Sequence, residues 1–114
     1  MAEVTILHNP KCSKSRETLK LIEEKGVAPK VVEYLKTPPT ANELAHILAL
    51  LGKSPRDILR KKEAAEAGID ADALSDAQLI AAMVAHPAVI ERPIVLANGK
   101  AALGRPPESV LEIL

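Results

Sequence analysis

Short apolar segments typical of β-strands lie near both ends of the chain, and they flank a middle third whose apolar residues follow a helical period. The four strand-like segments are residues 4–7, 31–35, 94–97 and 100–103. Between the first two, the apolar residues of segment 13–25 suit a helix that Gly26 would end. This strand–helix–strand spacing favours a parallel pair of strands joined by a right-handed crossover.

The middle third is expected to consist of helices. Their starts are marked by two capping boxes and one Ser-Pro pair, namely Thr40 with Glu43, Ser75 with Gln78, and Ser54-Pro55. The helix that begins at Ser54 is expected to run towards Arg60, and His86-Pro87 is expected to end the helix that begins at Ser75. These signals place a helical insertion at about residues 40–86.

The C-terminal third is expected to form a hairpin and a last helix. Asn98-Gly99 tolerates the positive φ angles of a type I′ turn, and Pro106-Pro107 is a suitable start for a helix. The order of elements is therefore β-α-β, a helical insertion, then β-β-α, which is an α/β protein with a mixed sheet. A chain of 114 residues has the usual size of one domain, so residues 1–114 are expected to form one.

The charge and composition exclude several classes of protein. Fifteen acidic and fifteen basic residues balance, so no overall field attracts nucleic acid or an anionic membrane. No apolar run approaches the ~20 residues that span a bilayer, and the first residues lack the features of a signal peptide. A single cysteine cannot form a disulfide bond within the chain, so the fold is not expected to depend on disulfides. We therefore expect a cytoplasmic protein that binds neither nucleic acid nor membrane.

Cys12 is the first candidate for chemistry. It follows a strand-like segment and precedes a helix, so it is expected at the helix N-terminus, where unpaired N–H groups favour a thiolate. Lys11, Lys14 and Arg16 surround it, and His8 lies just upstream. Such settings lower a thiol pKa from about 8.5 to roughly 3.5–7.5. The alternative is a small buried hydrophobic residue, which these polar neighbours disfavour.

The spacing around Cys12 disfavours three other chemistries. A redox dithiol needs a second cysteine where this chain has Ser15, and a phosphatase-type anion loop needs an arginine where it has Thr18. The three histidines and the one cysteine show no ligand spacing, so no metal site is expected. No glycine-rich phosphate loop is present.

Three arginines are the second candidates. Arg92 precedes a strand, Arg105 precedes the last helix, and Arg60 begins a basic run expected to end a helix. Each lies at the end of an element, where functional groups gather. The guanidinium fork matches oxyanions better than a lysine does. Taken alone, the basic run at Arg60 is more typical of a solvated helix face than of an anion site.

These segments together resemble the glutaredoxin-dependent arsenate reductases. The resemblance rests on residues 8–19 (His-Asn-Pro-Lys-Cys-Ser-Lys-Ser-Arg-Glu-Thr-Leu) and on residues 34–35, 38–40, 59–61, 86–87, 91–95 and 104–107. The matches keep the order of the family and cover essentially the whole chain. Lys11, Ser13 and Lys14 differ from the best-studied detoxifying members, and the chain stops at Leu114 without their C-terminal extension. The chain is therefore more similar to a short subgroup.

The resemblance implies a thioredoxin-like mixed sheet with a helical insertion, and it assigns roles to residues. Cys12 is implied as the nucleophile and His8 as the group that helps keep it ionised. The residues implied to hold the oxyanion are Arg60, Arg92 and Arg105. Ser15 and Pro93 are implied as supporting residues, with a cis peptide bond before Pro93.

The implied activity is reduction of arsenate to arsenite, coupled to glutathione and glutaredoxin. One cysteine cannot close an internal disulfide, so an outside thiol has to complete a two-electron reduction. Glutathione is therefore expected as a co-substrate, glutaredoxin as a partner, and no tightly bound cofactor. The small size favours a monomer.

Two alternatives stay open on the sequence. One is a glutathione-linked thiol oxidoreductase that acts on another substrate, because the lysines around Cys12 could retune its selectivity. The other is a regulator that binds RNA polymerase, as Spx-type proteins of this fold do. Ser15 removes the Cys-x-x-Cys switch of many such regulators, and they have little use for Arg60 and Arg105.

Overall fold

The computed structural model describes residues 3–114, and the chain divides into two compact units. Unit 1 consists of the residues up to Thr37 together with Arg92–Leu114, and unit 2 is Pro38–Glu91. Unit 2 corresponds to the helical insertion expected at about residues 40–86, with slightly wider bounds. The grouping of both units into one domain stays a prediction. No helix within residues 3–114 is long and apolar enough to cross a membrane.

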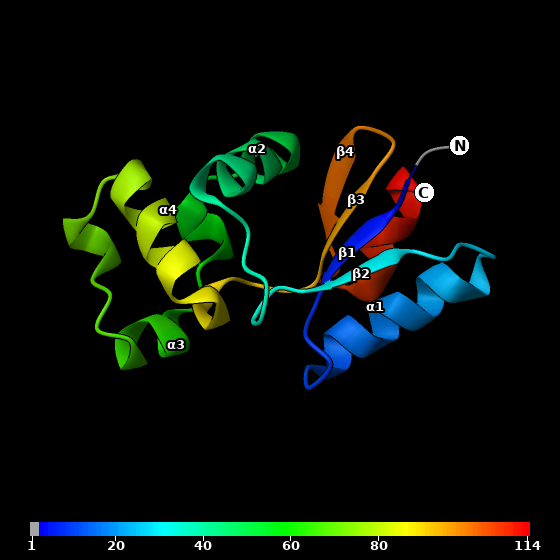
Figure 1. The fold of residues 1–114 in the computed structure, drawn as a ribbon, viewed down its shortest axis with the longest axis horizontal. Coiled ribbons are helices and arrows are strands. Elements are labelled where there is room, and N and C mark those ends of the chain that lie inside the picture. Colours follow the sequence, from blue (N-terminus) through cyan, green and yellow to red (C-terminus); the bar gives the residue numbers. More distant parts are fainter. Residues whose placement is uncertain (1–2) are drawn as a thin grey trace. The chain divides into compact units, whose positions relative to one another are not determined.

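Unit 1 is built on a mixed sheet. Within the described residues it has four strands, β1 (Thr5–His8), β2 (Lys30–Glu33), β3 (Ile94–Ala97) and β4 (Lys100–Leu103). Their order is β2-β1-β3-β4; β1 pairs with β2 in parallel, whereas β3 runs antiparallel to both β1 and β4 (Figure 1). The predicted parallel pair and the mixed sheet are confirmed.

The turn between β3 and β4 has the conformation that its two residues favour. Asn98 has a φ of 54° and Gly99 a φ of 72°, so both lie in the left-handed region that a type I′ turn requires. The Asn98 side chain also donates a hydrogen bond to the Ile113 carbonyl at 2.7 Å. The predicted hairpin is confirmed, and its tip is tied to the C-terminal segment.

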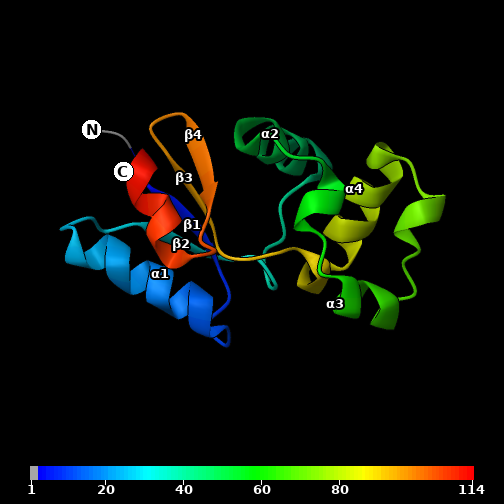
Figure 2. The same cartoon turned by 180° about the vertical axis from the view of Figure 1, so that it is seen from behind.

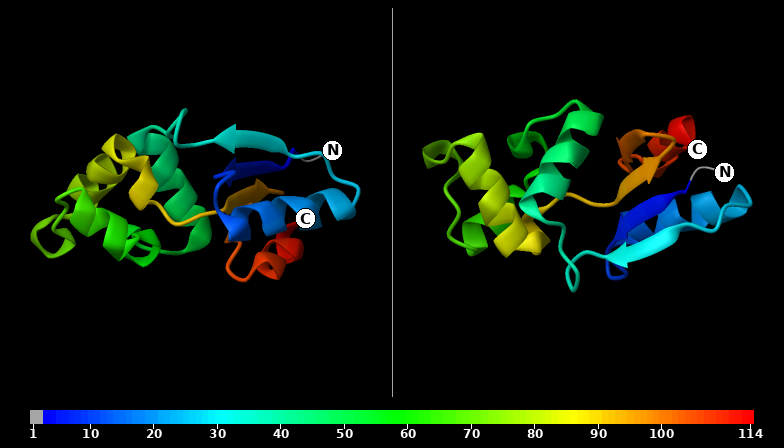
Figure 3. Two further views of the ribbon diagram at one scale, coloured as in Figure 1. Left: turned by 90° about the horizontal axis from the view of Figure 1, so that it is seen from below. Right: turned by 45° about the horizontal axis from the view of Figure 1, so that its top comes forward.

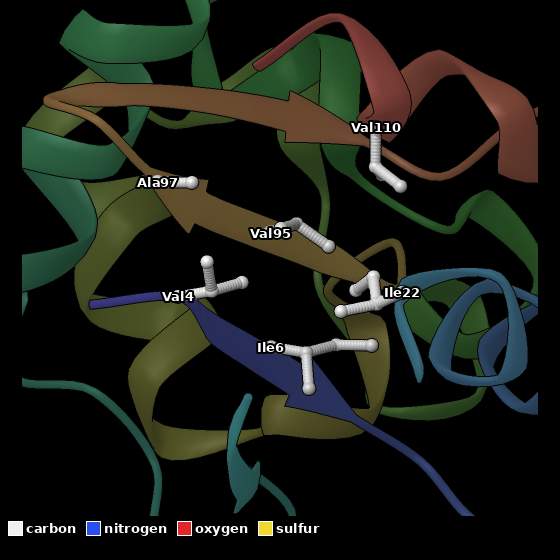
Figure 4. Close-up of a cluster of buried hydrophobic side chains, with 6 residues drawn as sticks. All are labelled: Val4, Ile6, Ile22, Val95, Ala97 and Val110. Carbon is white, nitrogen blue, oxygen red and sulfur yellow. The ribbon is translucent and has the colours of Figure 1, made fainter. Parts of the chain in front are cut away.

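One face of this sheet is covered by α1 (Ser13–Glu24) and by the 3₁₀ helix η4 (Pro107–Ile113), which contact each other (Figure 2). The side chains that meet there are aliphatic and are drawn in Figure 4: Val4, Ile6, Ile22, Val95, Ala97 and Val110. Val4, just before β1, and Ile6 within it alternate with residues that point away from this core, and Val95 and Ala97 do the same in β3, as the two-residue period of a strand requires. The core of unit 1 therefore depends on close packing of branched aliphatic side chains.

Two predicted elements of unit 1 differ in detail. Strand β2 ends at Glu33 and not at Leu35, because the Glu33 carbonyl accepts hydrogen bonds from the N–H groups of Lys36 (2.9 Å) and Thr37 (3.0 Å) in a turn. The C-terminal helix is a 3₁₀ helix. Its first hydrogen bond joins the Ser109 N–H to the Pro106 carbonyl at 3.0 Å, which is the i→i+3 pattern of a 3₁₀ helix. So short a segment offers few of the i→i+4 hydrogen bonds of an α-helix.

Unit 2 consists of helices and short 3₁₀ turns (Figure 3). Its elements are α2 (Ala41–Leu51), η1 (Pro55–Ile58), α3 (Lys61–Glu66), η2 (Ala71–Ala73), α4 (Asp76–Ala85) and η3 (Pro87–Val89). Both predicted capping boxes are present, at Thr40 with Glu43 and at Ser75 with Gln78. The helical character of this segment is therefore confirmed.

The helix predicted from Ser54 towards Arg60 is wrong in its length. It ends as η1 at Ile58, because Leu59 becomes extended and pairs with Ile90 in an isolated bridge. The Arg60 N–H donates to the Val89 carbonyl at 2.7 Å, and Arg60 is then the N-cap of α3. The basic run at Arg60 therefore begins a helix and does not end one.

Removal of a core side chain of unit 1 should lower the free energy of unfolding. The Ile22 side chain is fully buried between α1 and the sheet, so Ile22→Ala should cost about 2–5 kcal/mol. Val31→Ala is the control, since Val31 is 45% exposed and should cost about 0.5 kcal/mol or less. Urea denaturation checks both values, and equal costs would contradict the core described here.

Candidate active site

Cys12 lies at the N-terminus of α1, as the sequence predicts. It is the N-cap residue, with extended backbone angles of −96° and 124°. Its N–H donates to the Asn9 carbonyl, and its own carbonyl accepts from the Arg16 N–H, both at 3.0 Å. The backbone thus holds Cys12 between the end of β1 and the first turn of the helix, and its side chain is only partly buried.

The thiol is surrounded by hydrogen-bond donors. Partial burial alone would raise the pKa of Cys12, but hydrogen bonds from the Ser15 N–H, from Arg92 and from the Lys14 N–H stabilise the thiolate. The positive charge of Arg92 acts in the same direction, and together these groups lower the pKa of Cys12 below its ordinary value. Arg105 adds another donor, since its Nη2 lies 3.6 Å from the Cys12 Sγ. Cys12 is therefore set up to ionise more readily than an ordinary thiol.

The two arginines next to the sulfur come from distant parts of the chain, and the sheet explains their proximity. Arg92 precedes β3 and Arg105 follows β4; Ile94 and Leu103 are paired partners in that hairpin. The Arg105 Nε donates to the Arg92 carbonyl at 2.8 Å. The β3–β4 hairpin therefore brings Arg105 back to the edge of the sheet at which Arg92 lies.

Strand β1 brings the loop with Cys12 to the same edge. Leu7 is paired with Ile94 in the antiparallel β1–β3 pair, so the end of β1 lies beside the start of β3. The peptide bond between Arg92 and Pro93 is cis, as the resemblance implies. A second cis bond joins Arg105 to Pro106, which the sequence analysis does not predict.

A network of polar contacts fixes the loop between β1 and α1. The fully buried Ser15 hydroxyl accepts a hydrogen bond from the Asn9 N–H at 3.0 Å and lies 2.6 Å from the His8 Nδ1. The Asn9 side chain accepts from the Lys11 N–H at 3.0 Å. Asn9 is a residue that the sequence analysis missed. Its signal was present, since asparagine commonly turns the backbone in this manner.

His8 is buried in β1, with 6% of its surface exposed. Burial lowers the pKa of His8; nearby Glu33 raises it and Arg16 lowers it, and the net shift is downward. The imidazole is therefore mostly neutral at pH 7, and its Nδ1 can accept the Ser15 hydroxyl proton in a hydrogen bond. The role of His8 in keeping Cys12 ionised stays a prediction.

Arg60 belongs to unit 2, where two carboxylates hold it. Its Nη1 donates to Glu91 Oε1 at 2.7 Å, and its Nε contacts Glu63. Burial would lower the pKa of Arg60, but Glu63 and Glu91 raise it above the ordinary value. The sequence analysis missed both partners, although Glu63 lies three residues from Arg60, where helical side chains meet. The anion-binding role of Arg60 stays a prediction.

The geometry of unit 1 places a thiol beside several hydrogen-bond donors, two of them cationic. Backbone N–H groups at a helix N-terminus and two guanidinium groups surround one sulfur. Within residues 3–114, no group of three or more His, Cys, Asp and Glu side chains is arranged to hold a metal ion. Such a site can ionise a thiol and hold an anion close to it.

Comparisons with known proteins give the family. Residues 7–113 match the ArsC family, and the chain belongs to that family. It is 54% identical to the uncharacterized protein YfgD of Escherichia coli K12, over 98% of this chain and 97% of that protein. It is 50% identical to the arsenate reductase of Neisseria meningitidis serogroup A, over the full length of both.

A solved structure agrees with this assignment. The arsenate reductase from Vibrio cholerae superposes with a TM-score of 0.92 at 53% identity, and the match covers 98% of each chain. The thioredoxin-like α/β fold and the resemblance to arsenate reductases are thereby confirmed.

The lowered pKa of Cys12 should be visible in its reactivity. Iodoacetamide reacts with the thiolate, so the alkylation rate of Cys12 should rise with pH around a midpoint below that of an unperturbed thiol. Arg92→Gln should move this midpoint upward, because it removes a positive charge and a donor to the sulfur. A midpoint at or above the ordinary value in the unaltered protein would contradict the geometry.

Proposed function

We propose that this protein reduces arsenate to arsenite, with Cys12 as the nucleophile. The observation that carries the proposal is the environment of one sulfur, whose pKa is lowered by two backbone N–H groups and Arg92 and which lies 3.6 Å from the Arg105 Nη2. The arsenate reductase of Neisseria meningitidis, 50% identical over its full length, supports arsenate as the substrate.

The donors around Cys12 reduce the main physical obstacle to the reaction, which is the electrostatic repulsion between the thiolate and the arsenate anion. Two unit charges 4 Å apart repel by about 4 kcal/mol at an effective dielectric of 20. Arg92 and Arg105 place positive charge beside the sulfur and offset a repulsion of that size. Arg60 is proposed as a third ligand of the oxyanion, and binding there would compete with Glu63 and Glu91 for its guanidinium.

The first step joins sulfur to arsenic. The Cys12 thiolate attacks arsenic(V), an S–As bond forms, and one oxygen leaves as water after protonation. The guanidinium groups hold the remaining oxygens. Arsenic keeps its oxidation state in this step, so the reduction follows later.

The second step supplies the electrons. The sulfur of glutathione attacks the Cys12 sulfur, the S–As bond breaks, and its electron pair stays on arsenic, which leaves as arsenite. A mixed disulfide between Cys12 and glutathione remains, and glutaredoxin reduces it by thiol exchange. Glutathione is thus a co-substrate and no tightly bound cofactor takes part. We propose that the protein acts as a monomer in the cytoplasm, where glutathione is held reduced.

Replacement of the nucleophile tests the chemistry. Cys12→Ser should lower arsenate reduction coupled to glutathione and glutaredoxin by at least about a thousandfold, because a hydroxyl does not ionise near pH 7. Consumption of NADPH through glutathione reductase measures the reaction. Retained activity would remove Cys12 from the mechanism. An unaltered protein that reduces glutathione mixed disulfides but not arsenate would redirect the proposal to another substrate.

Replacement of an anion ligand tests the binding site. Arg92→Ala should raise KM for arsenate and lower kcat/KM by about a hundredfold, in line with the loss of one charged donor in an anion site. Lys100→Ala is the control, since Lys100 is an exposed cation at the start of β4, at the other end of the strand from Arg105. Similar kinetics for both variants would show that general charge, and not Arg92, governs binding.

A further inference from the structure

Gly104 differs from every other glycine of the chain. Gly26, Gly52, Gly68 and Gly99 all have positive φ angles, and an added Cβ would meet nothing within 4 Å at any of them. Their conformation explains their presence. Gly104 has no positive φ, and other side chains occupy the space that a Cβ at this position would need. It is therefore a glycine for reasons of space.

A Cβ at position 104 would collide with two neighbours. It would lie 2.6 Å from the Thr18 Oγ1 and 3.1 Å from the Thr18 Cγ2, and 2.7 Å from the Pro93 Cγ. Ordinary carbon contacts begin near 3.5 Å, so the neighbours would have to move by several tenths of an ångström.

Neither neighbour has much freedom to move by itself. Thr18 is fully buried in α1, and its hydroxyl donates to the Lys14 carbonyl at 2.8 Å. Pro93 has a closed ring, and its carbonyl accepts the Gly104 N–H at 2.9 Å. A methyl group at position 104 would therefore push α1 and the segment around Pro93 away from the end of β4.

Each of these three segments carries one part of the site. Thr18 is bonded to the first turn of α1, whose N–H groups at Lys14 and Ser15 lower the pKa of Cys12. Pro93 directly follows Arg92, and Gly104 directly precedes Arg105. The contact between Gly104, Thr18 and Pro93 lies at the junction of the thiol and its two guanidinium groups.

We propose that Gly104 and Thr18 are positioning residues, which set the spacing between the Cys12 sulfur and the guanidinium groups of Arg92 and Arg105. This inference rests on the proposed function where it concerns arsenate, but the spacing also governs the thiol itself. An error of about 1 Å in such an arrangement costs up to about a hundredfold in rate.

Gly104→Ala is the central variant, and Gly26→Ala is its matched control. Both add one methyl group, but the control introduces backbone strain at a helix end without any steric contact. Gly104→Ala should raise the pH midpoint of Cys12 alkylation by iodoacetamide. It should also lower kcat/KM for arsenate by about ten- to a hundredfold. The control should change neither. Equal midpoints and equal kcat/KM in the two variants would overturn the proposal.

A second substitution separates spacing from general damage. Thr18→Ala removes two of the three colliding atoms, so its addition to Gly104→Ala should return the midpoint part of the way to that of the unaltered protein. Additive effects of the two changes would overturn the proposal. If Gly104→Ala fails to fold, Thr18→Ala alone should still raise the midpoint, because it leaves a gap in the same contact, and an unchanged midpoint would count against it.

The pH midpoint of Cys12 alkylation tests the positioning role separately from the proposed function. Alkylation of Cys12 needs no arsenate. A protein that does not reduce arsenate, but whose thiol midpoint shifts in Gly104→Ala, would refute the function and support the positioning role. A protein that reduces arsenate with an unshifted midpoint and unchanged kcat/KM in Gly104→Ala would do the reverse.

Discussion

The antiparallel position of β3 between β1 and β4 is the constraint on which the site depends. It places the end of β1, the start of β3 and the end of β4 at one edge of the sheet. The loop with Cys12 and the two Arg-Pro dipeptides leave the sheet at that edge. The Arg105 Nη2 therefore lies 3.6 Å from the Cys12 sulfur although the two residues are 93 positions apart, and no local feature of the sequence could bring them together.

Partial burial disfavours a thiolate, and in this protein several neutral and charged hydrogen-bond donors together stabilise it. The N–H groups of Lys14 and Ser15 act on the sulfur directly, and Arg92 adds both a hydrogen bond and a full charge. The Ser15 hydroxyl is used differently, since it joins the Asn9 backbone to the His8 ring beneath the loop. One serine thus supports the site through its backbone and fixes the loop through its side chain.

Much of this arrangement follows from the sequence, because strand periodicity, capping boxes and the Asn98-Gly99 turn are local signals that packing reinforces. Several of the failures have a common cause. The end of η1 at Ile58 depends on pairing of Leu59 with Ile90, and the carboxylates beside Arg60 include the distant Glu91. The crowding at Gly104 likewise involves α1 and Pro93. Such contacts between distant segments leave no periodic trace in a single sequence.

The hydrogen bond from the Arg105 Nε to the Arg92 carbonyl links the two guanidinium-bearing segments mechanically. Because the Arg105 Nε is bonded to this carbonyl, we expect any shift of the Arg105 side chain to act on the peptide group between Arg92 and Pro93 as well. The two arginines would then adjust their positions together and not one at a time.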